Sequence, residues 1–173
     1  HIESIGERVL IIGAGNTAMD CCRPARRIGG REARAMARKP REFFKASPWE
    51  LEDAEDENVE ILVNHSPKRF VIENGKLTGM EFELMEYQLD ESGRITDTKI
   101  AGSKIIPCDD VILAIGQENA FPWIERDAGI EFDKWGVPIV DETTHESSLK
   151  GVFFGGDSAF GPKNIIWAVE HGH

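Results

Sequence analysis

The 173-residue sequence lacks several features that mark membrane, secreted and metal-binding proteins. Its longest apolar runs, 9–12 and 111–115, are far shorter than the roughly 20 residues that a membrane-spanning helix needs. No signal peptide opens the chain, and three cysteines, of which Cys21 and Cys22 are adjacent, cannot form a fully paired disulfide framework. We therefore expect a cytoplasmic protein that contacts no membrane. No metal site is predicted, because the histidines are scattered without ligand spacing: His1, His65, His145, His171 and His173.

Basic charge is also scarce, with 20 Lys and Arg against 31 Asp and Glu and a net charge of −11. Binding to nucleic acid is therefore not expected, because phosphate contacts need clustered Lys and Arg. The bases that do occur are unevenly placed, since residues 23–45 carry nine bases and two acids while the remainder of the chain is strongly acidic. Such a basic segment is either an anion site or a solvated helix face.

The order of elements predicts the α/β class, with a Rossmann-like parallel sheet, helices on both faces and an antiparallel β-meander crossover. Asn74-Gly75 predicts a type I′ hairpin turn in the meander, at 68–107, and Pro24 predicts a kink or a break in the first helix. The capping box Ser47-Pro48-Trp49-Glu50 predicts the start of the second helix. Strands are expected at 9–12, 33–38, 59–63, 109–115 and 151–154, and helices at 16–28, 47–58 and from 165.

The first chemical motif is Gly13-Ala14-Gly15-Asn16-Thr17-Ala18, which has the form G-x-G-x-x-A between a strand and a helix. The first glycine permits the tight turn, the second lets a pyrophosphate approach the backbone, and Ala18 lets helix and strand pack closely. The helix start offers free N–H groups and a positive dipole end. A dinucleotide site is the favoured interpretation; a purely structural glycine turn and a methyltransferase-type loop are the alternatives.

The second motif follows the second predicted strand, where many NAD sites carry an acid that binds the ribose 2′-hydroxyl. Here the sequence has Arg38-Lys39, with Arg41 close by. A carboxylate would repel a 2′-phosphate, whereas a guanidinium can bind it with two hydrogen bonds. The pattern favours NADPH over NADH, although the bases could merely solvate the sheet edge.

A third motif, Gly155-Gly156-Asp157, follows a short apolar run near the end of the chain. A carboxylate in this position could hold a sugar-like polyol, or Asp157 could simply cap a turn. Cys21, Cys22 and all four tryptophans, Trp49, Trp123, Trp135 and Trp167, are expected to be packing residues rather than redox or stacking groups.

Four motifs together resemble the small (beta) subunit of glutamate synthase and its relatives in the two-dinucleotide-binding-domain flavoprotein superfamily. They are GAGNTAMD at 13–20, Arg38-Lys39, AIG at 114–116 and GGD at 155–157. The resemblance implies an NADPH domain at 1–116 and, at 117–173, a connection followed by the C-terminal piece of an FAD domain. It implies that Asp20 lies near the nicotinamide, that Gly116, Gly156 and Asp157 contribute to the cofactor sites, and that the helix after Asn164 points at the flavin.

The resemblance also implies an activity, in which NADPH reduces FAD and electrons pass to an iron–sulfur segment or a partner subunit. No acid, base or nucleophile is needed from this chain, and no catalytic side chain is predicted. The sequence shows neither a second G-x-G-x-x-G nor a cysteine-rich segment, so we expect the chain to be inactive without the rest of an FAD domain. The alternative is a nucleotide-binding module that works as a sensor or assembly domain without catalysis.

Overall fold

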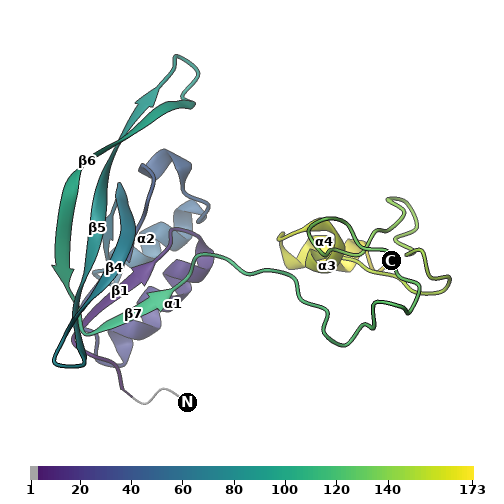
Figure 1. Ribbon diagram of the computed structural model, residues 1–173, viewed down its shortest axis with the longest axis horizontal. Helices are drawn as coiled ribbons and strands as arrows, with labels where there is room; N and C mark the ends of the chain where they lie inside the picture. Colours follow the sequence, from purple (N-terminus) through teal and green to yellow (C-terminus); the bar gives the residue numbers. More distant parts are fainter. Residues whose placement is uncertain (1–3) are drawn as a thin grey trace. The chain divides into compact units, whose positions relative to one another are not determined.

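A computed structural model describes residues 4–173 and divides the chain into two compact units. The first unit extends to Gly116 and the second covers Gln117–His173. Each unit has its own buried apolar core. Figure 1 shows the helices and strands of both units. No helix in the described part is long and apolar enough to cross a membrane.

A four-stranded parallel sheet forms the centre of the first unit. Its strands are β1 (Arg8–Ile12), β2 (Glu32–Met36), β3 (Glu60–Leu62) and β7 (Asp110–Leu113), in the order β3-β2-β1-β7. Because all four strands are parallel, their carboxyl ends lie along one edge of the sheet, where ligands of open α/β sheets bind.

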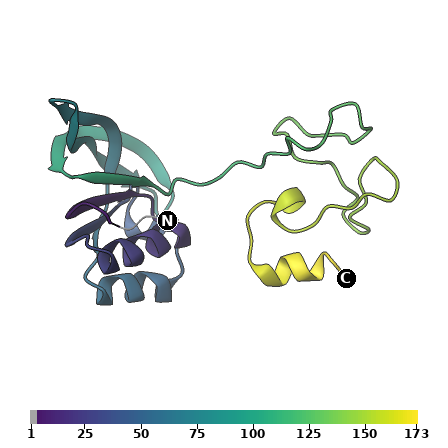
Figure 2. The same ribbon diagram turned by 90° about the horizontal axis from the view of Figure 1, so that it is seen from below.

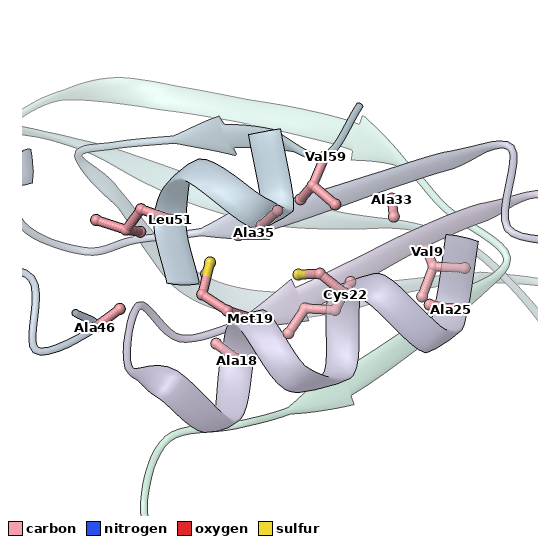
Figure 3. Packing of buried hydrophobic residues seen from close by; sticks show 12 residues of the cluster. Val9, Ala18, Met19, Cys22, Ala25, Ala33, Ala35, Ala46, Leu51 and Val59 are labelled. Carbon is pink, nitrogen blue, oxygen red and sulfur yellow. The ribbon is translucent and has the colours of Figure 1, made fainter. Parts of the chain in front are cut away.

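Helices α1 (Asn16–Arg27) and α2 (Pro48–Asp56) cover one face of this sheet. Figure 3 shows the small and medium side chains that fill the space between, with Met19 and Cys22 of α1 facing the strands. Of the two alternatives predicted at Pro24, a kink or a break, the break is wrong, since α1 is one helix through Pro24. Proline removes only its own donor, and the helix continues beyond it because the Ile28 N–H donates to the Pro24 carbonyl (3.0 Å).

An antiparallel meander covers the other face. It consists of β4 (His65–Glu73), β5 (Lys76–Leu89) and β6 (Ile95–Pro107), and its first turn has Asn74 and Gly75 at φ of 50° and 75°, as a type I′ turn requires. Leu10 and Ile12 of β1 pack against Phe82 and other meander residues in a second core.

The predicted α/β class, with a parallel sheet, helices and a meander, is confirmed. The predicted helices on both faces are not found in the first unit, where Figure 2 shows three layers: helices, parallel sheet and meander. The meander supplies the apolar face, with Met80 and Phe82, that a second helical layer would otherwise provide.

The second unit contains two short helices, α3 (Asp157–Phe160) and α4 (Ile165–Glu170). It has a small core around Ile124, Ile130 and Phe154, against which Ala159 of α3 packs. The strand predicted at 151–154 is reduced to one bridge, between Phe153 and Glu146. The prediction that the tryptophans pack inside the chain is also wrong. The tryptophan side chains are exposed: 65% for Trp49, 72% for Trp123, 75% for Trp135 and 43% for Trp167.

Candidate dinucleotide-binding site

Three predicted motifs of the first unit meet at the carboxyl edge of the parallel sheet. The glycine loop follows β1, Arg38 and Lys39 follow β2, and Gly116 lies three residues beyond β7. The order β3-β2-β1-β7 places them in a row, with the basic pair on one side of the glycine loop and Gly116 on the other.

Gly13 is required by the fold itself. Its φ of 147° lies in the region that favours glycine, and its N–H donates to the Met36 carbonyl at 3.1 Å. A Cβ atom here would lie 2.3 Å from the carbonyl oxygen of Ala114. The turn after β1 therefore closes against the end of β7, which leaves no room for any side chain.

Gly15, unlike Gly13, is not required by the fold. Its φ of −104° and ψ of 177° suit any residue, and a Cβ atom there would meet nothing within 4 Å. The fold therefore gives no reason for glycine at this position. A glycine that a fold does not need fits a site where a ligand approaches the backbone.

The backbone around Gly15 has free donors. Within residues 4–173, the N–H groups of residues 14–17 find no intramolecular acceptor, and α1 has no acid in its first turn. The first N–H groups of α1 that donate within the chain are those of Ala18 and Met19, and both donate to the Gly15 carbonyl. The start of α1 thus offers several donors and the positive end of a helix dipole to an anion.

The other motif residues hold the loop in place. The Ala14 carbonyl accepts from the N–H groups of Lys45 and Ala46, both at 3.2 Å, and Asn16 Oδ1 accepts from the Ser47 N–H at 2.9 Å. The Ser47 hydroxyl also points to Asn16, at 3.4 Å, and does not cap α2, so the reciprocal capping box is not formed. The segment 45–47 is thereby fastened to the glycine loop. Thr17, like Asn16, is exposed at the helix start.

The basic segment 23–45 separates into two sets. One set serves the scaffold: Arg26 donates to the backbone carbonyls of residues 30, 31 and 57, and five other arginines form ion pairs. These pairs are Arg23 with Glu50, Asp53 and Glu57, Arg27 with Glu57, Arg31 with Glu7, Arg34 with Glu32 and Glu60, and Arg41 with Glu55. The interpretation of this segment as a structural surface therefore holds for six of its nine bases.

The second set is Arg38, Lys39 and Lys45, which are exposed and have no carboxylate partner within residues 4–173. All three lie at the carboxyl edge: two follow β2 directly, and Lys45 is bonded through its N–H to the glycine loop. Lys39 Nζ lies over the Phe43 ring, 5.6 Å from its centroid. Lys45 is the functional candidate that sequence reasoning missed, although its place just before the Ser47 helix start was a usable signal.

Hydrogen bonds shift the pKa of the groups in the paired set. Two bonds from Arg41, at 2.6 and 2.9 Å, lower the pKa of Glu55 and raise that of Arg41. Bonds from Arg27 and Arg23 lower the pKa of Glu57 to about 2. Arg41, which the sequence placed beside the basic pair, thus serves α2 rather than a ligand.

Asp20 is exposed on α1, one turn beyond the glycine loop, and its carboxylate has no hydrogen-bond partner within the described chain. The Asp20 carboxylate is therefore free to contact a ligand. Its place near the nicotinamide remains a prediction. Cys22, two residues further along α1, is a buried packing residue as predicted, and burial raises the pKa of its thiol to about 12. Burial likewise raises the pKa of Cys108, which lies just before β7, to about 11. Neither thiol is poised for redox chemistry.

In the second unit, the Gly155-Gly156-Asp157 turn is built around His171. The Gly156 N–H donates to His171 Nδ1 at 2.9 Å, and a Cβ atom on Gly155 would lie 2.8 Å from the His171 Cβ. Gly156 also has a positive φ of 58°. Sequence reasoning gave His171 no role, because it lies two residues from the end of the chain. The contact with the glycine turn cannot be deduced from spacing.

Asp157 and Asn164 both organise the turns that precede helices. Asp157 is exposed and accepts from the Lys163 N–H at 3.1 Å, and Asn164 caps α4 by accepting from the Trp167 N–H at 3.3 Å. The other carboxylate oxygen of Asp157 has no hydrogen-bond partner, and the carboxylate forms no ion pair within the described residues. The carboxylate can therefore still accept from a polyol hydroxyl.

The fold is a Rossmann-type α/β domain with an antiparallel meander, and its glycine loop has the form found in dinucleotide-binding folds. The family model for pyridine nucleotide-disulphide oxidoreductases matches residues 1–172, and the chain belongs to this family. The resemblance drawn from the motifs is thereby confirmed.

Similar proteins agree with this assignment. The chain is 32% identical to the glutamate synthase [NADPH] small chain of Azospirillum brasilense, over 99% of this chain and 36% of that protein. It is also 32% identical to the NADPH-Fe(3+) oxidoreductase subunit beta of Geobacter sulfurreducens, over 98% of this chain and 29% of that protein. The thioredoxin reductase of T. acidophilum has the same fold, with a TM-score of 0.75 and 21% identity over 98% of this chain and 50% of that one. The chain thus spans about a third of the length of these two curated relatives.

Proposed function

We propose that the first unit is the NADPH-binding module of an FAD-dependent oxidoreductase similar to the glutamate synthase small subunit. The observation that carries this proposal is the contrast between the two loop glycines. Gly13 is needed by the fold, whereas Gly15 leaves an open space over free N–H groups that nothing in the described chain fills. A pyrophosphate that approaches the Gly15 backbone accounts for both the space and the donors.

Different residues bind different parts of the NADPH molecule in this proposal. Residues 14–17 donate backbone N–H groups to the pyrophosphate, and the side chain of Asn16 holds the loop through Ser47. Arg38, Lys39 and Lys45, whose charges have no carboxylate partner among residues 4–173, would bind the ribose 2′-phosphate. No carboxylate follows β2 to bind a 2′-hydroxyl, so the site favours NADPH over NADH.

In the complete protein, we propose that hydride passes from the nicotinamide to an FAD flavin, which is chemistry that the two cofactors supply. The chain's own part is to orient the nucleotide and to exclude side reactions. Asp20 would lie near the nicotinamide, and Gly116 would border the nucleotide at the end of β7. The second unit would contribute Gly156 and Asp157 to the FAD ribityl chain, with Asn164 and α4 beside the flavin. Electrons would then pass to an iron–sulfur segment or to a partner subunit.

Equilibrium binding tests this proposal directly. The 173-residue chain should bind NADPH with a 1:1 stoichiometry in a calorimetric titration, and Gly15→Val should abolish that binding. Circular dichroism should show that the variant keeps its fold, because a Cβ atom at this position meets no protein atom within 4 Å and the backbone angles of Gly15 suit any residue. Binding of NADPH by a folded Gly15→Val variant would show that the loop is only a structural turn.

A further inference from the structure

The Gly155-Gly156-Asp157 turn of the second unit depends on a side chain that the function described so far does not use. The Gly155 carbonyl accepts from the Ser158 hydroxyl at 2.6 Å, and the Gly156 carbonyl accepts from two N–H groups of α3. The Gly156 N–H donates to His171 Nδ1, and this ring nitrogen is its acceptor within residues 4–173. The bond joins residues that are 15 positions apart and ties the turn to the end of α4.

The direction of this bond fixes the position of the proton on His171. A backbone N–H can only donate, so the Nδ1 atom that accepts from Gly156 carries no proton. His171 is therefore neutral in this structure, with its proton on Nε2. An imidazolium ion has a proton on both ring nitrogens, and its Nδ1–H would point at the Gly156 N–H instead of accepting from it.

His145, which lies beside His171, makes the opposite kind of bond. Its Nδ1 is 3.1 Å from the His171 carbonyl oxygen, and a carbonyl can only accept, so His145 carries a proton on Nδ1. His145 can gain a second proton on Nε2 and keep this bond. Because the two ring centroids are 4.8 Å apart, two imidazolium charges at this position would also repel each other.

Other groups surround the His171 ring without replacing its bond to the turn. The Phe160 and Trp167 rings, with centroids 4.4 and 6.1 Å from that of His171, carry no charge. The charged and titratable groups around the ring are His145 itself, Glu142, Glu170 and His173 in the hollow beside it, Asp157 in the turn, Asp141 near His145 and Lys163 over the Trp167 ring. Their charges affect the pH at which the ring gains a proton. They do not change the fact that a protonated Nδ1 cannot accept from the Gly156 N–H.

We propose that His171 is the positioning residue of the Gly155-Gly156-Asp157 turn and that it holds the turn only in its neutral state. Acidification releases the Gly156 N–H and thereby the position of Asp157, which follows it directly. Histidine ordinarily changes its charge between about pH 5 and pH 8, so the release lies within that range. The consequence for flavin rests on the proposed function, in which Asp157 contacts the FAD ribityl chain. Acid would loosen the FAD side alone, since none of the residues proposed to bind NADPH is a histidine.

Nuclear magnetic resonance of the whole, isotope-labelled 173-residue chain without any cofactor tests this proposal. At about pH 8, the ring nitrogens should show an unprotonated Nδ1 in His171 and a protonated Nδ1 in His145. As the pH falls to about 5, the amide resonances of Gly156 and Asp157 should move to a second position. Amide resonances that stay unaltered over this range, or a protonated His171 Nδ1 at the alkaline end, would overturn the proposal.

His171→Asn separates the loss of the acceptor from a general effect of acid. The asparagine Oδ1 is attached to Cγ, as Nδ1 is in histidine, and it accepts a hydrogen bond at either end of the titration. In this variant the Gly156 amide should keep its alkaline position throughout, whereas His171→Phe, which has no acceptor, should show the released position at both ends. A transition that persists in His171→Asn would overturn the proposal.

His173→Asn is the matched control, because His173 lines the same hollow and its side chain forms no hydrogen bond among the described residues. The same substitution at this position should leave the Gly156 transition unchanged, and its loss there would overturn the assignment to His171. Because the spectra are recorded without nucleotide or flavin, their outcome is separate from that of the NADPH titration, whose failure would refute the proposed function alone.

Discussion

Replacing Arg38 by alanine should convert the chain from an NADPH-selective protein to one that scarcely distinguishes the two nicotinamide cofactors. Arg38 lies two residues after the end of β2, is exposed, and has no carboxylate partner among residues 4–173. No ion pair is broken when its side chain is removed, so the substitution should change binding without changing the fold. The assay is calorimetric titration of each variant with NADPH and with NADH.

The expected loss of NADPH affinity follows from the hydrogen bond between Arg38 and the 2′-phosphate, which the substitution removes. A hydrogen bond between charged partners contributes roughly 1.5–3 kcal/mol, so Arg38→Ala should weaken NADPH binding by about ten- to a hundredfold. NADH has no 2′-phosphate and should bind the variant as it binds the unmodified chain. Lys39 and Lys45 remain in the variant and keep part of the attraction for the 2′-phosphate. Because salt screens exposed charges, the loss of NADPH affinity caused by Arg38→Ala should become smaller as the salt concentration rises.

Arg41→Ala provides the control, because Arg41 is only three residues away but donates two hydrogen bonds to Glu55. Its removal should lower the stability of the α2 region and leave both cofactor affinities within about twofold. Equal losses for NADPH and NADH in Arg38→Ala would refute the assignment of the 2′-phosphate. So would an Arg41→Ala variant that loses NADPH affinity as strongly as Arg38→Ala does.

Three further predictions concern the scaffold and the second unit. Gly13→Ala should destabilise the fold by about 1–3 kcal/mol, measured by urea unfolding, because its Cβ would meet the Ala114 carbonyl, whereas Gly15→Val should cost about 1 kcal/mol or less. Glu57→Gln should unfold more easily than the unmodified chain at pH 7, because hydrogen bonds from Arg27 and Arg23 depress the folded pKa of Glu57. This difference in stability should shrink as the pH falls from the unfolded pKa of about 4.5 toward the folded pKa of about 2, and it should vanish below that value. A difference that stays at its pH 7 size down to pH 2 would contradict this. The purified chain should lose added FAD on gel filtration, because Asp157 and the end of α4 offer a few contacts against an association cost of roughly 4–15 kcal/mol; a retained flavin absorbance band would contradict this.

The elements of the first unit could be predicted because local signals and packing agree there. The run at 9–12 is buried on both faces and became β1, and Asn74-Gly75 supplied the turn that its conformation prefers. The motif residues from Gly13 to Ala18 behave as their spacing predicts, with one glycine required by the turn and one facing open space. Periodicity is informative where a sheet buries its strands so completely.

Other features depend on contacts between distant residues, which spacing does not reveal. The second face of the sheet is covered by the meander because Phe82 and Met80 pack there, and strand patterns alone do not say which layer they join. Ser47 bonds to Asn16, 31 residues away, instead of capping its own helix. The basic segment could be recognised as a whole, but its division into paired and unpaired bases required the positions of the acids on α2 and β3.

The division of the basic segment has a consequence for how this chain can change over time. The arginines that stabilise the scaffold and the three bases proposed to bind a phosphate occupy separate positions, so exchange at 38, 39 or 45 breaks no ion pair among residues 4–173. A lineage could therefore move between phosphorylated and unphosphorylated nicotinamide cofactors through a few surface substitutions, each with little effect on folding. Selection on cofactor supply and selection on thermal resistance would act on different residues of the same segment. An engineer who wishes to retune the cofactor has, for the same reason, a short and independent set of positions to vary.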